Sequence, residues 1–225
     1  MKVVLFDIDG TLLISRGIGR EAKRRAMQEC FGQTGDLDSH IFGGKTDWGI
    51  LADLLAPHGH SASDIGRDMP AYEAVMARHM REISGAYTAD PCPHAMELVQ
   101  ALRGRDDTLI GLVTGNTSMT AAIKLEMAGY ASDWFVVGAY GNESPDRDDL
   151  TRLARQRAGE HLGRDLNGAE LIVIGDTPAD IQAARAIDAV AVAVCTGYAG
   201  RDSLIGSDPD FLLADLSTFM ELVLN

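Results

Sequence analysis

Short apolar runs alternate with amphipathic stretches through the second half of the chain. Each run has the length and composition of a buried strand, and each stretch has the spacing of a helix with one apolar face. A first strand is expected within 3–13, and others within 107–114, 133–140, 170–176 and 189–197. Helices are predicted at 118–128, 146–163, 178–187 and 215–224. This alternation predicts an α/β fold with a doubly wound parallel sheet.

Residues 15–88 break this pattern, because they contain no run of β-branched residues and are rich in helix formers. Helices are expected at 19–31, 46–56 and 63–84, and Pro70 is expected to kink or split the third. We therefore predict a core domain formed by 1–14 and 89–225, with a smaller all-helical cap domain, 15–88, inserted after the first strand. The alternative is that these helices only cover one edge of the sheet.

Composition and charge narrow the classes of partner. The 225 residues are 46% hydrophobic and 24% charged, which is ordinary for a globular protein. A formal net charge of -13 argues against nucleic acid or an anionic membrane surface as the main partner, because both would repel the chain. No signal peptide or run of about 18 apolar residues is visible. We expect a soluble cytoplasmic protein, and the three cysteines without a CxxC pair fit a reducing compartment.

Acidic and hydroxyl side chains follow the ends of several predicted strands. Asp7 and Asp9 end the first strand and project to the same side of it, where they repel each other unless a cation lies between them. Later strands end in Thr114-Gly115-Asn116 and in Gly175-Asp176-Thr177-Pro178-Ala179-Asp180. Ligands usually bind at this end of a parallel sheet, and oxygen ligands suit Mg²⁺. The alternative is that the acids only open solvated turns.

The sequences "DIDGT", "VTGN" and "GDTPAD" occur in the order typical of one family. The chain resembles the haloacid dehalogenase superfamily, in the phosphatase branch that carries a helical cap. The resemblance spans essentially the whole chain and implies a Rossmann-like core, Mg²⁺ as cofactor and a small phosphorylated substrate. It also implies that Asp7 is the nucleophile that takes the phosphoryl group, and that Asp9 is the general acid and base.

The resemblance further implies the binding residues. The Mg²⁺ ligands would be the Asp7 carboxylate, the Asp9 backbone carbonyl and Asp176. Asp180 would lie in the outer shell and orient a water or a loop. Thr114 would donate a hydrogen bond to a phosphoryl oxygen, with backbone N–H groups near Gly115 and Asn116 assisting.

The active-site cation is the least regular part of the match. Many relatives have a lysine before the last motif, but this chain has four lysines and none there. Arg147 is the best-placed cation, and its alternative is a solvated pairing with acids of its own helix. Lys124 is the rival, for which a structural or solvated role is expected.

Other basic residues are candidates for contacts with the substrate. Lys45 lies in "FGGKTDWGIL", which resembles a cap loop that closes over the active site, and it could bind a substrate carboxylate or phosphate. An ordinary glycine-rich turn with a solvated lysine is an equal alternative. Arg16 and Arg20 are further candidates, and an exposed basic helix face is their alternative.

The predicted function is an Mg²⁺-dependent phosphomonoester hydrolase that acts on a small phosphorylated metabolite through an aspartyl-phosphate intermediate. A phosphomutase of the β-phosphoglucomutase type would use the same residues. A non-catalytic binding or regulatory protein is a third reading, although Asp7, Asp9, Thr114 and Asp176 are all present. Dehalogenation is disfavoured, because the resemblance implies no acid at the position of Asp9 in that branch.

Overall fold

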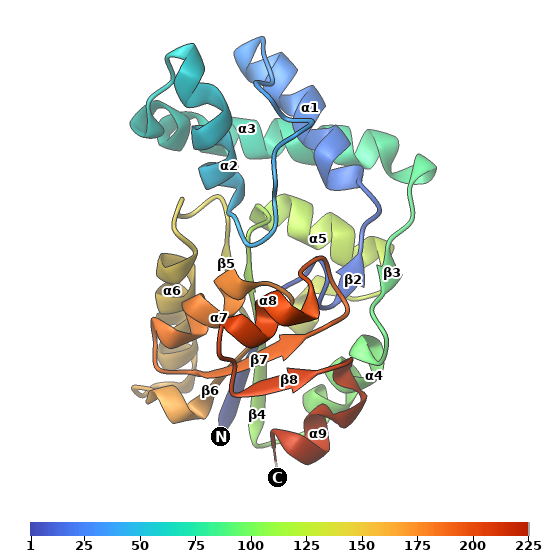
Figure 1. The fold of residues 1–225 in the computed structure, drawn as a ribbon, viewed down its shortest axis with the longest axis vertical. Coiled ribbons are helices and arrows are strands. Elements are labelled where there is room, and N and C mark those ends of the chain that lie inside the picture. The colour runs from blue at the N-terminus through green and yellow to red at the C-terminus, as the bar shows by residue number, and fades with distance from the viewer. Residues whose placement is uncertain (225) are drawn as a thin grey trace.

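A computed structural model describes residues 1–224, and its main sheet has six parallel strands (Figure 1). They are β1 (Lys2–Phe6), β4 (Thr108–Thr114), β5 (Val137–Tyr140), β6 (Leu171–Gly175), β7 (Val190–Val194) and β8 (Phe211–Leu213). The order across the sheet is β5-β4-β1-β6-β7-β8, so β1 lies between β4 and β6. The predicted doubly wound parallel sheet is confirmed.

Helices cover both faces of this sheet. They are α4 (Ala95–Arg103), α5 (Ser118–Met127), α6 (Arg147–Leu162), α7 (Pro178–Arg185), α8 (Arg201–Gly206) and α9 (Phe219–Leu222). Because side chains alternate along a strand, Val4 and Phe6 of β1 pack towards α4, α5 and α9. Val3 and Leu5 pack towards α6, α7 and α8 on the opposite face. Both faces of β1 are buried, which explains its nearly continuous apolar run.

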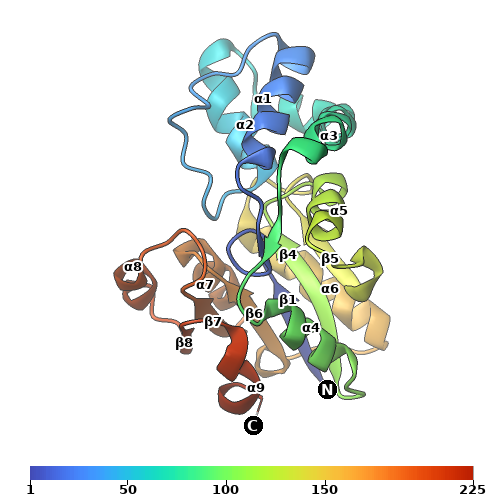
Figure 2. The ribbon, with the colours of Figure 1, turned by 90° about the vertical axis from the view of Figure 1, so that its right-hand side faces the viewer.

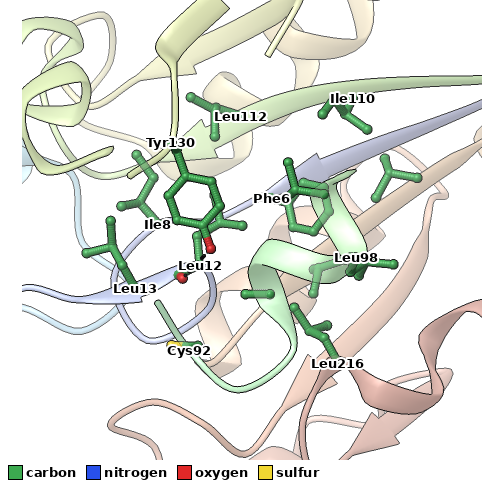
Figure 3. Packing of buried hydrophobic residues seen from close by; sticks show 14 of the residues in the cluster. Phe6, Ile8, Leu12, Leu13, Cys92, Leu98, Ile110, Leu112, Tyr130 and Leu216 are labelled. Carbon is green, nitrogen blue, oxygen red and sulfur yellow. Dashed lines mark hydrogen bonds between the residues drawn. The ribbon is translucent and has the colours of Figure 1, made fainter. Parts of the chain in front are cut away.

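The segment that follows β1 is held by the apolar core beneath it (Figure 3). Phe6, Ile8 and Leu12 are fully buried, and the Tyr130 hydroxyl donates a 3.0 Å hydrogen bond to the Leu12 carbonyl. Gly10 has φ of 89°, in the left-handed region that glycine adopts without strain. Buried residues before, between and after Asp7 and Asp9 therefore hold the turn that carries these two acids.

The inserted segment forms a second layer of helices above the carboxyl ends of the strands (Figure 2). Its helices are α1 (Ile18–Phe31), α2 (Asp47–Leu55) and α3 (Ala62–Ile83). They share an apolar cluster that includes Met27, Leu51 and Tyr72, and Ile123 of α5 packs into the same cluster. The chain leaves and re-enters the sheet through β2 (Leu13–Ile14) and β3 (Asp90–Pro91), which pair antiparallel.

The third helix of the insertion continues past its proline. Of the two expected effects of Pro70, the split is wrong, because α3 is a single element, and the kink stays a prediction. Its buried face runs along its length through Ile65, Met69, Tyr72 and Met76, so packing holds the helix on both sides of the proline.

One predicted strand is shorter than expected. The run 133–140 begins with a turn of 3₁₀ helix, Ser132–Trp134, and only Val137–Tyr140 pairs with β4. Among the described helices, none combines the length and the apolar character that crossing a bilayer requires.

Candidate active site

The acids and the threonine of the strand ends meet at one place on the sheet. Asp7, Thr114 and Asp176 end or directly follow the neighbouring strands β1, β4 and β6, and each is at least 93% buried. The Asp7 N–H donates to the Ile174 carbonyl at 2.9 Å, which fixes the two strand ends relative to each other. A Cβ on Gly10 would lie 2.4 Å from Asp176 Oδ2, so the turn after β1 approaches this acid more closely than a side chain allows.

Arg147, the first residue of α6, lies between two of the acids. Its Nη2 is 3.0 Å from Asp7 Oδ1 and 2.5 Å from Asp180 Oδ1, and it also donates to the Val113 carbonyl at 3.2 Å. Burial works against its charge, but Asp180 and Asp7 raise the pKa of the guanidinium. The side chain is 8% exposed, so the alternative of a solvated pairing on its own helix is wrong.

Asp9 has a separate set of partners. Its Oδ2 accepts hydrogen bonds from Lys124 Nζ at 2.6 Å and from Asn116 Nδ2 at 2.8 Å, and its Oδ1 accepts one from Ser15 at 2.6 Å. Burial raises the pKa of Asp9, but the charge and hydrogen bond of Lys124, with those of Ser15 and Asn116, bring it below its usual value. Asp9 is thus held as a carboxylate.

Lys124 is therefore part of the site. Its side chain is 6% exposed, which contradicts the expected solvated role, and it also donates to Asn116 Oδ1 at 2.7 Å. Sequence reasoning gave this residue too little weight because its place along α5 does not reveal where the helix points. The two cations divide the acids between them, Arg147 beside Asp7 and Lys124 beside Asp9.

Three buried carboxylates come close enough to share a cation. Oxygens of Asp7, Asp176 and Asp180 lie within 4.8 Å of one another. Burial raises the pKa of Asp176 to about 8, with the charges of Asp180 and Asp7 adding to the effect, and burial raises that of Asp7 to about 6 despite Arg147. Asp176 Oδ2 accepts the Tyr198 N–H at 2.8 Å, whereas its buried Oδ1 has no hydrogen-bond partner among the described residues.

These residues fit a divalent cation, because one guanidinium leaves this group of acids with excess negative charge and an unpaired oxygen. The Asp180 carboxylate has more polar contacts within the protein than that of Asp176. Its Oδ2 accepts from the Thr177 N–H at 3.0 Å and from the Thr177 hydroxyl at 2.7 Å, which caps α7. Its Oδ1 faces Arg147. The expectation that Asp180 lies outside the direct ligands is compatible with these contacts and stays a prediction.

A cavity of about 900 Å³ lies between this group of acids and the inserted helices. Asp7, Asp9, Thr114, Gly115, Asn116, Lys124, Arg147 and Asp176 line its floor. Lys45 also lines it, but its Nζ lies 2.7 Å from Asp53 and its side chain is 43% exposed. Arg16 pairs with Asp90, and Arg20 donates to backbone carbonyls of the loop at 37–40.

Two acids of the insertion bind the first turn of α5. Asp47 Oδ2 accepts the Thr117 N–H at 3.1 Å, and its other oxygen lies 2.5 Å from the buried Lys23 Nζ. Glu73 Oε1 accepts from the Ser118 hydroxyl at 2.7 Å and from the Met119 N–H at 2.9 Å. Both carboxylates are at least 92% buried and lie at the end of α5 where its dipole favours negative charge.

Backbone contacts extend this junction to the loops after β4 and β5. The Asp47 N–H donates to the Gly115 carbonyl at 2.7 Å, and the Trp48 N–H donates to the Gly141 carbonyl at 2.9 Å. A Cβ on Gly115 would lie 2.1 Å from the Lys45 carbonyl, so the insertion touches this loop closely.

Sequence reasoning did not identify Lys23, Asp47 or Glu73 as members of this junction. An acid within the apolar face of α3 was the available signal for Glu73, because Tyr72 and Met76 beside it are buried. Nothing in their spacing signalled that Lys23 and Asp47 would pair, since they are 24 residues apart on different helices.

Comparison with known proteins gives the family. A model of the haloacid dehalogenase-like hydrolases matches residues 1–188, and the chain belongs to this family. A phosphoglycolate phosphatase of Synechococcus elongatus is 28% identical over 99% of this chain and 97% of its own length. Validoxylamine A 7'-phosphate phosphatase of Streptomyces hygroscopicus subsp. limoneus is 26% identical over 96% of this chain and 94% of its own length.

A solved structure supports the same fold. The structure of CbbY from Rhodobacter sphaeroides in complex with phosphate matches with a TM-score of 0.69 and 16% identity, covering 97% of this chain and 96% of that one. The family match, together with relatives named as phosphatases, supports a phosphatase hydrolase.

The raised pKa of Asp176 predicts a pH dependence of stability without metal. Between about pH 4 and 8 the folded chain holds a proton that the unfolded chain releases, so its free energy of unfolding should fall as the pH rises through this window. The Asp176→Asn variant lacks this proton. In EDTA, the Tm of both proteins is to be measured at pH 5 and at pH 8. The decrease in Tm over this range should be larger for the wild type than for the variant, by about 3 °C or more.

Mg²⁺ should reverse more of that loss at pH 8 in the wild type than in Asp176→Asn. Thermal unfolding monitored by circular dichroism measures both effects. Equal slopes of Tm against pH in the two proteins would contradict the burial of an ionisable Asp176.

Proposed function

We propose that this haloacid dehalogenase-like hydrolase is an Mg²⁺-dependent phosphomonoesterase that acts on a small phosphorylated metabolite through an aspartyl phosphate on Asp7. The observation that carries the proposal is the buried Asp7 carboxylate, which lies 3.0 Å from Arg147, close to Asp176, and at the floor of a cavity. The relatives' names add support, because two of similar identity are named for different phosphomonoesters. What they share is the class of reaction.

In the first step, a carboxylate oxygen of Asp7 attacks phosphorus, and the bond between phosphorus and the leaving oxygen breaks. Asp9 is a carboxylate in the substrate-free protein, so it first takes a proton from solvent and then passes it to the leaving oxygen. The Arg147 guanidinium keeps the attacking carboxylate oriented and offsets charge that develops on the phosphoryl oxygens. The Thr114 hydroxyl and the N–H groups near Gly115 and Asn116 would bind those oxygens.

In the second step, Asp9 takes a proton from water, the water oxygen attacks phosphorus, and Asp7 leaves as a carboxylate with release of phosphate. The lowered pKa of Asp9 suits this step, since the group must begin it as a base. Asp7, the Asp9 backbone carbonyl and Asp176 would hold Mg²⁺. When bound, the ion would neutralise charge on the acids and the phosphoryl group.

We further propose that residues 15–88 act as a cap over this site. The support is that Asp47 and Glu73 reach across to the first turn of α5, directly after the loop at 114–116. The same helix carries Lys124, which holds Asp9. Closing the insertion would thus order the phosphate loop and the proton-transferring acid together.

Replacing the nucleophile tests the reaction. Asp7→Asn keeps the size of the side chain but removes the attacking charge, so kcat with 4-nitrophenyl phosphate and Mg²⁺ should fall by about 10⁴-fold or more. Phosphate release and the circular dichroism spectrum should be measured together, because a folded, inactive variant is expected. Unchanged turnover would exclude Asp7 as nucleophile, and transfer to a second sugar hydroxyl in the wild type without phosphate release would favour a mutase.

Replacing Arg147 and replacing Lys124 should change the activity in different ways. Arg147→Ala removes the positive charge beside Asp7 and should lower kcat/KM by about 10²- to 10³-fold at every pH. Lys124→Ala should cost less and should instead move the acidic limb of the pH–rate profile upward, since the pKa of Asp9 loses its main depressing partner. Identical pH–rate profiles for wild type and Lys124→Ala would contradict the assigned pairing.

Glu73→Gln tests the cap contact. The amide keeps the size of the side chain, but it loses the charge and places N–H groups where donors already converge. We expect KM to rise about fivefold and the N–H groups of the first turn of α5 to exchange faster by hydrogen-exchange mass spectrometry. Glu82→Gln on the same helix is the matched control, because Glu82 pairs at the surface with Arg78. Equal behaviour of the two variants would argue against the cap contact.

A further inference from the structure

The cavity is large for the smallest phosphomonoesters. Its volume of about 900 Å³ lies at the upper end of small-molecule pockets. A phosphoryl group bound at Asp7 and Arg147 occupies only the floor, and a two-carbon acid attached to it would leave most of the remaining space to water. The space above the phosphoryl group is therefore a site for a larger organic group.

The cations of the insertion that line the cavity already have partners within the protein. Lys23 lies 2.5 Å from Asp47, Lys45 lies 2.7 Å from Asp53, and Arg16 lies 2.8 Å from Asp90.

Arg20 has no carboxylate partner within residues 1–224. Its Nη1 and Nη2 nonetheless donate to carbonyls of the loop at 37–40, and its guanidinium lies 4.1 Å from the centre of the Phe42 ring. A carboxylate on the organic part of the substrate would compete with these partners, and at Lys23, Lys45 and Arg16 it would also be repelled by the paired acid.

Two large, exposed side chains with apolar surface line the same cavity, one from the insertion and one from the core. Ile41 of the insertion is 79% exposed, and Tyr198 of the loop after β7 is 65% exposed, and both line the cavity. Exposed apolar groups that line a cavity favour a ligand with an apolar face. Tyr198 is well placed for this, because its N–H is fixed to Asp176 Oδ2, next to the acids that would hold the metal.

From these observations we propose that the substrate is the phosphate monoester of an uncharged, hydroxyl-bearing ring of sugar size. The ring's C–H face packs on Tyr198 and Ile41, and its hydroxyls face the polar residues of the insertion that line the cavity. This rests on the proposed phosphatase function and adds the class of leaving group. A small ester with a carboxylate on its organic part, such as 2-phosphoglycolate, is disfavoured as the best substrate, because the cavity offers it excess volume and because the cations of the insertion that line the cavity already have partners.

Initial rates of phosphate release test this. The substrates are a panel of hexose monophosphates, glycerol 3-phosphate as an ester with a small uncharged organic part, 2-phosphoglycolate, and 4-nitrophenyl phosphate as a general control. We expect kcat/KM for the best hexose monophosphate to exceed that for 2-phosphoglycolate by about tenfold or more, with glycerol 3-phosphate between them. A higher kcat/KM for 2-phosphoglycolate would overturn the inference.

Variants of the apolar wall separate ring packing from general activity. Tyr198→Ser should raise KM for the hexose ester about fivefold with little change in kcat, and should change KM for glycerol 3-phosphate less than about twofold. Tyr198→Phe should retain the wild-type KM. Ile205→Ser, an exposed apolar residue outside the cavity, is the control.

Equal effects of Tyr198→Ser on the hexose ester and on glycerol 3-phosphate would overturn the proposed packing of the substrate ring on Tyr198. Failure to release phosphate from every compound, 4-nitrophenyl phosphate included, would instead contradict the phosphatase function. The two proposals are therefore distinguishable.

Discussion

The placing of several carboxylates around one buried guanidinium is the constraint on which the rest of the site depends. Asp7, Asp176 and Asp180 approach within 4.8 Å of one another, and within residues 1–224 Arg147 is the one cation paired with acids of this group. Charges this close inside a protein raise one another's pKa, and burial adds to the effect. A proton or a further cation relieves this repulsion, so the same repulsion that opposes the metal-free, ionised form would supply affinity for the proposed divalent ion.

A second buried pair, Lys124 with Asp9, gives the neighbouring acid a different character. The pKa of Asp9 is lowered, whereas that of Asp7, two residues away, is raised. Divergent pKa values in adjacent acids are typical of sites that divide nucleophile and proton-transfer roles. Because Lys124 belongs to α5, whose first turn is bound by Asp47 and Glu73, this difference is tied to the position of the inserted helices.

Much of the fold could be predicted because it depends on local periodicity. The alternating strands and helices predicted between 107 and 197 and the three helices of the insertion agree with the structure to within a few residues, whereas α8 was not predicted. Two errors have physical causes. Pro70 does not split α3, since burial of Tyr72 and its neighbours holds the helix together, and β8 has only three residues, too few for a pattern. Helix α4, by contrast, has Ala95, Leu98, Val99 and Leu102 at readable spacing and could have been assigned.

The sequence by itself determined the identity and order of the acids, because each group lies within a few residues at the end of one strand. Asp7 with Asp9, and Asp176 with Asp180, are local arrangements. Only the tertiary structure decided which cation faces which acid. Arg147 reaches Asp7 across 140 positions and Lys124 reaches Asp9 across 115, on helices whose directions depend on strand order and packing against the sheet. Local spacing carries no record of such long-range contacts, so the pairings of Lys23 with Asp47 and of Glu73 with α5 became visible only in the folded chain.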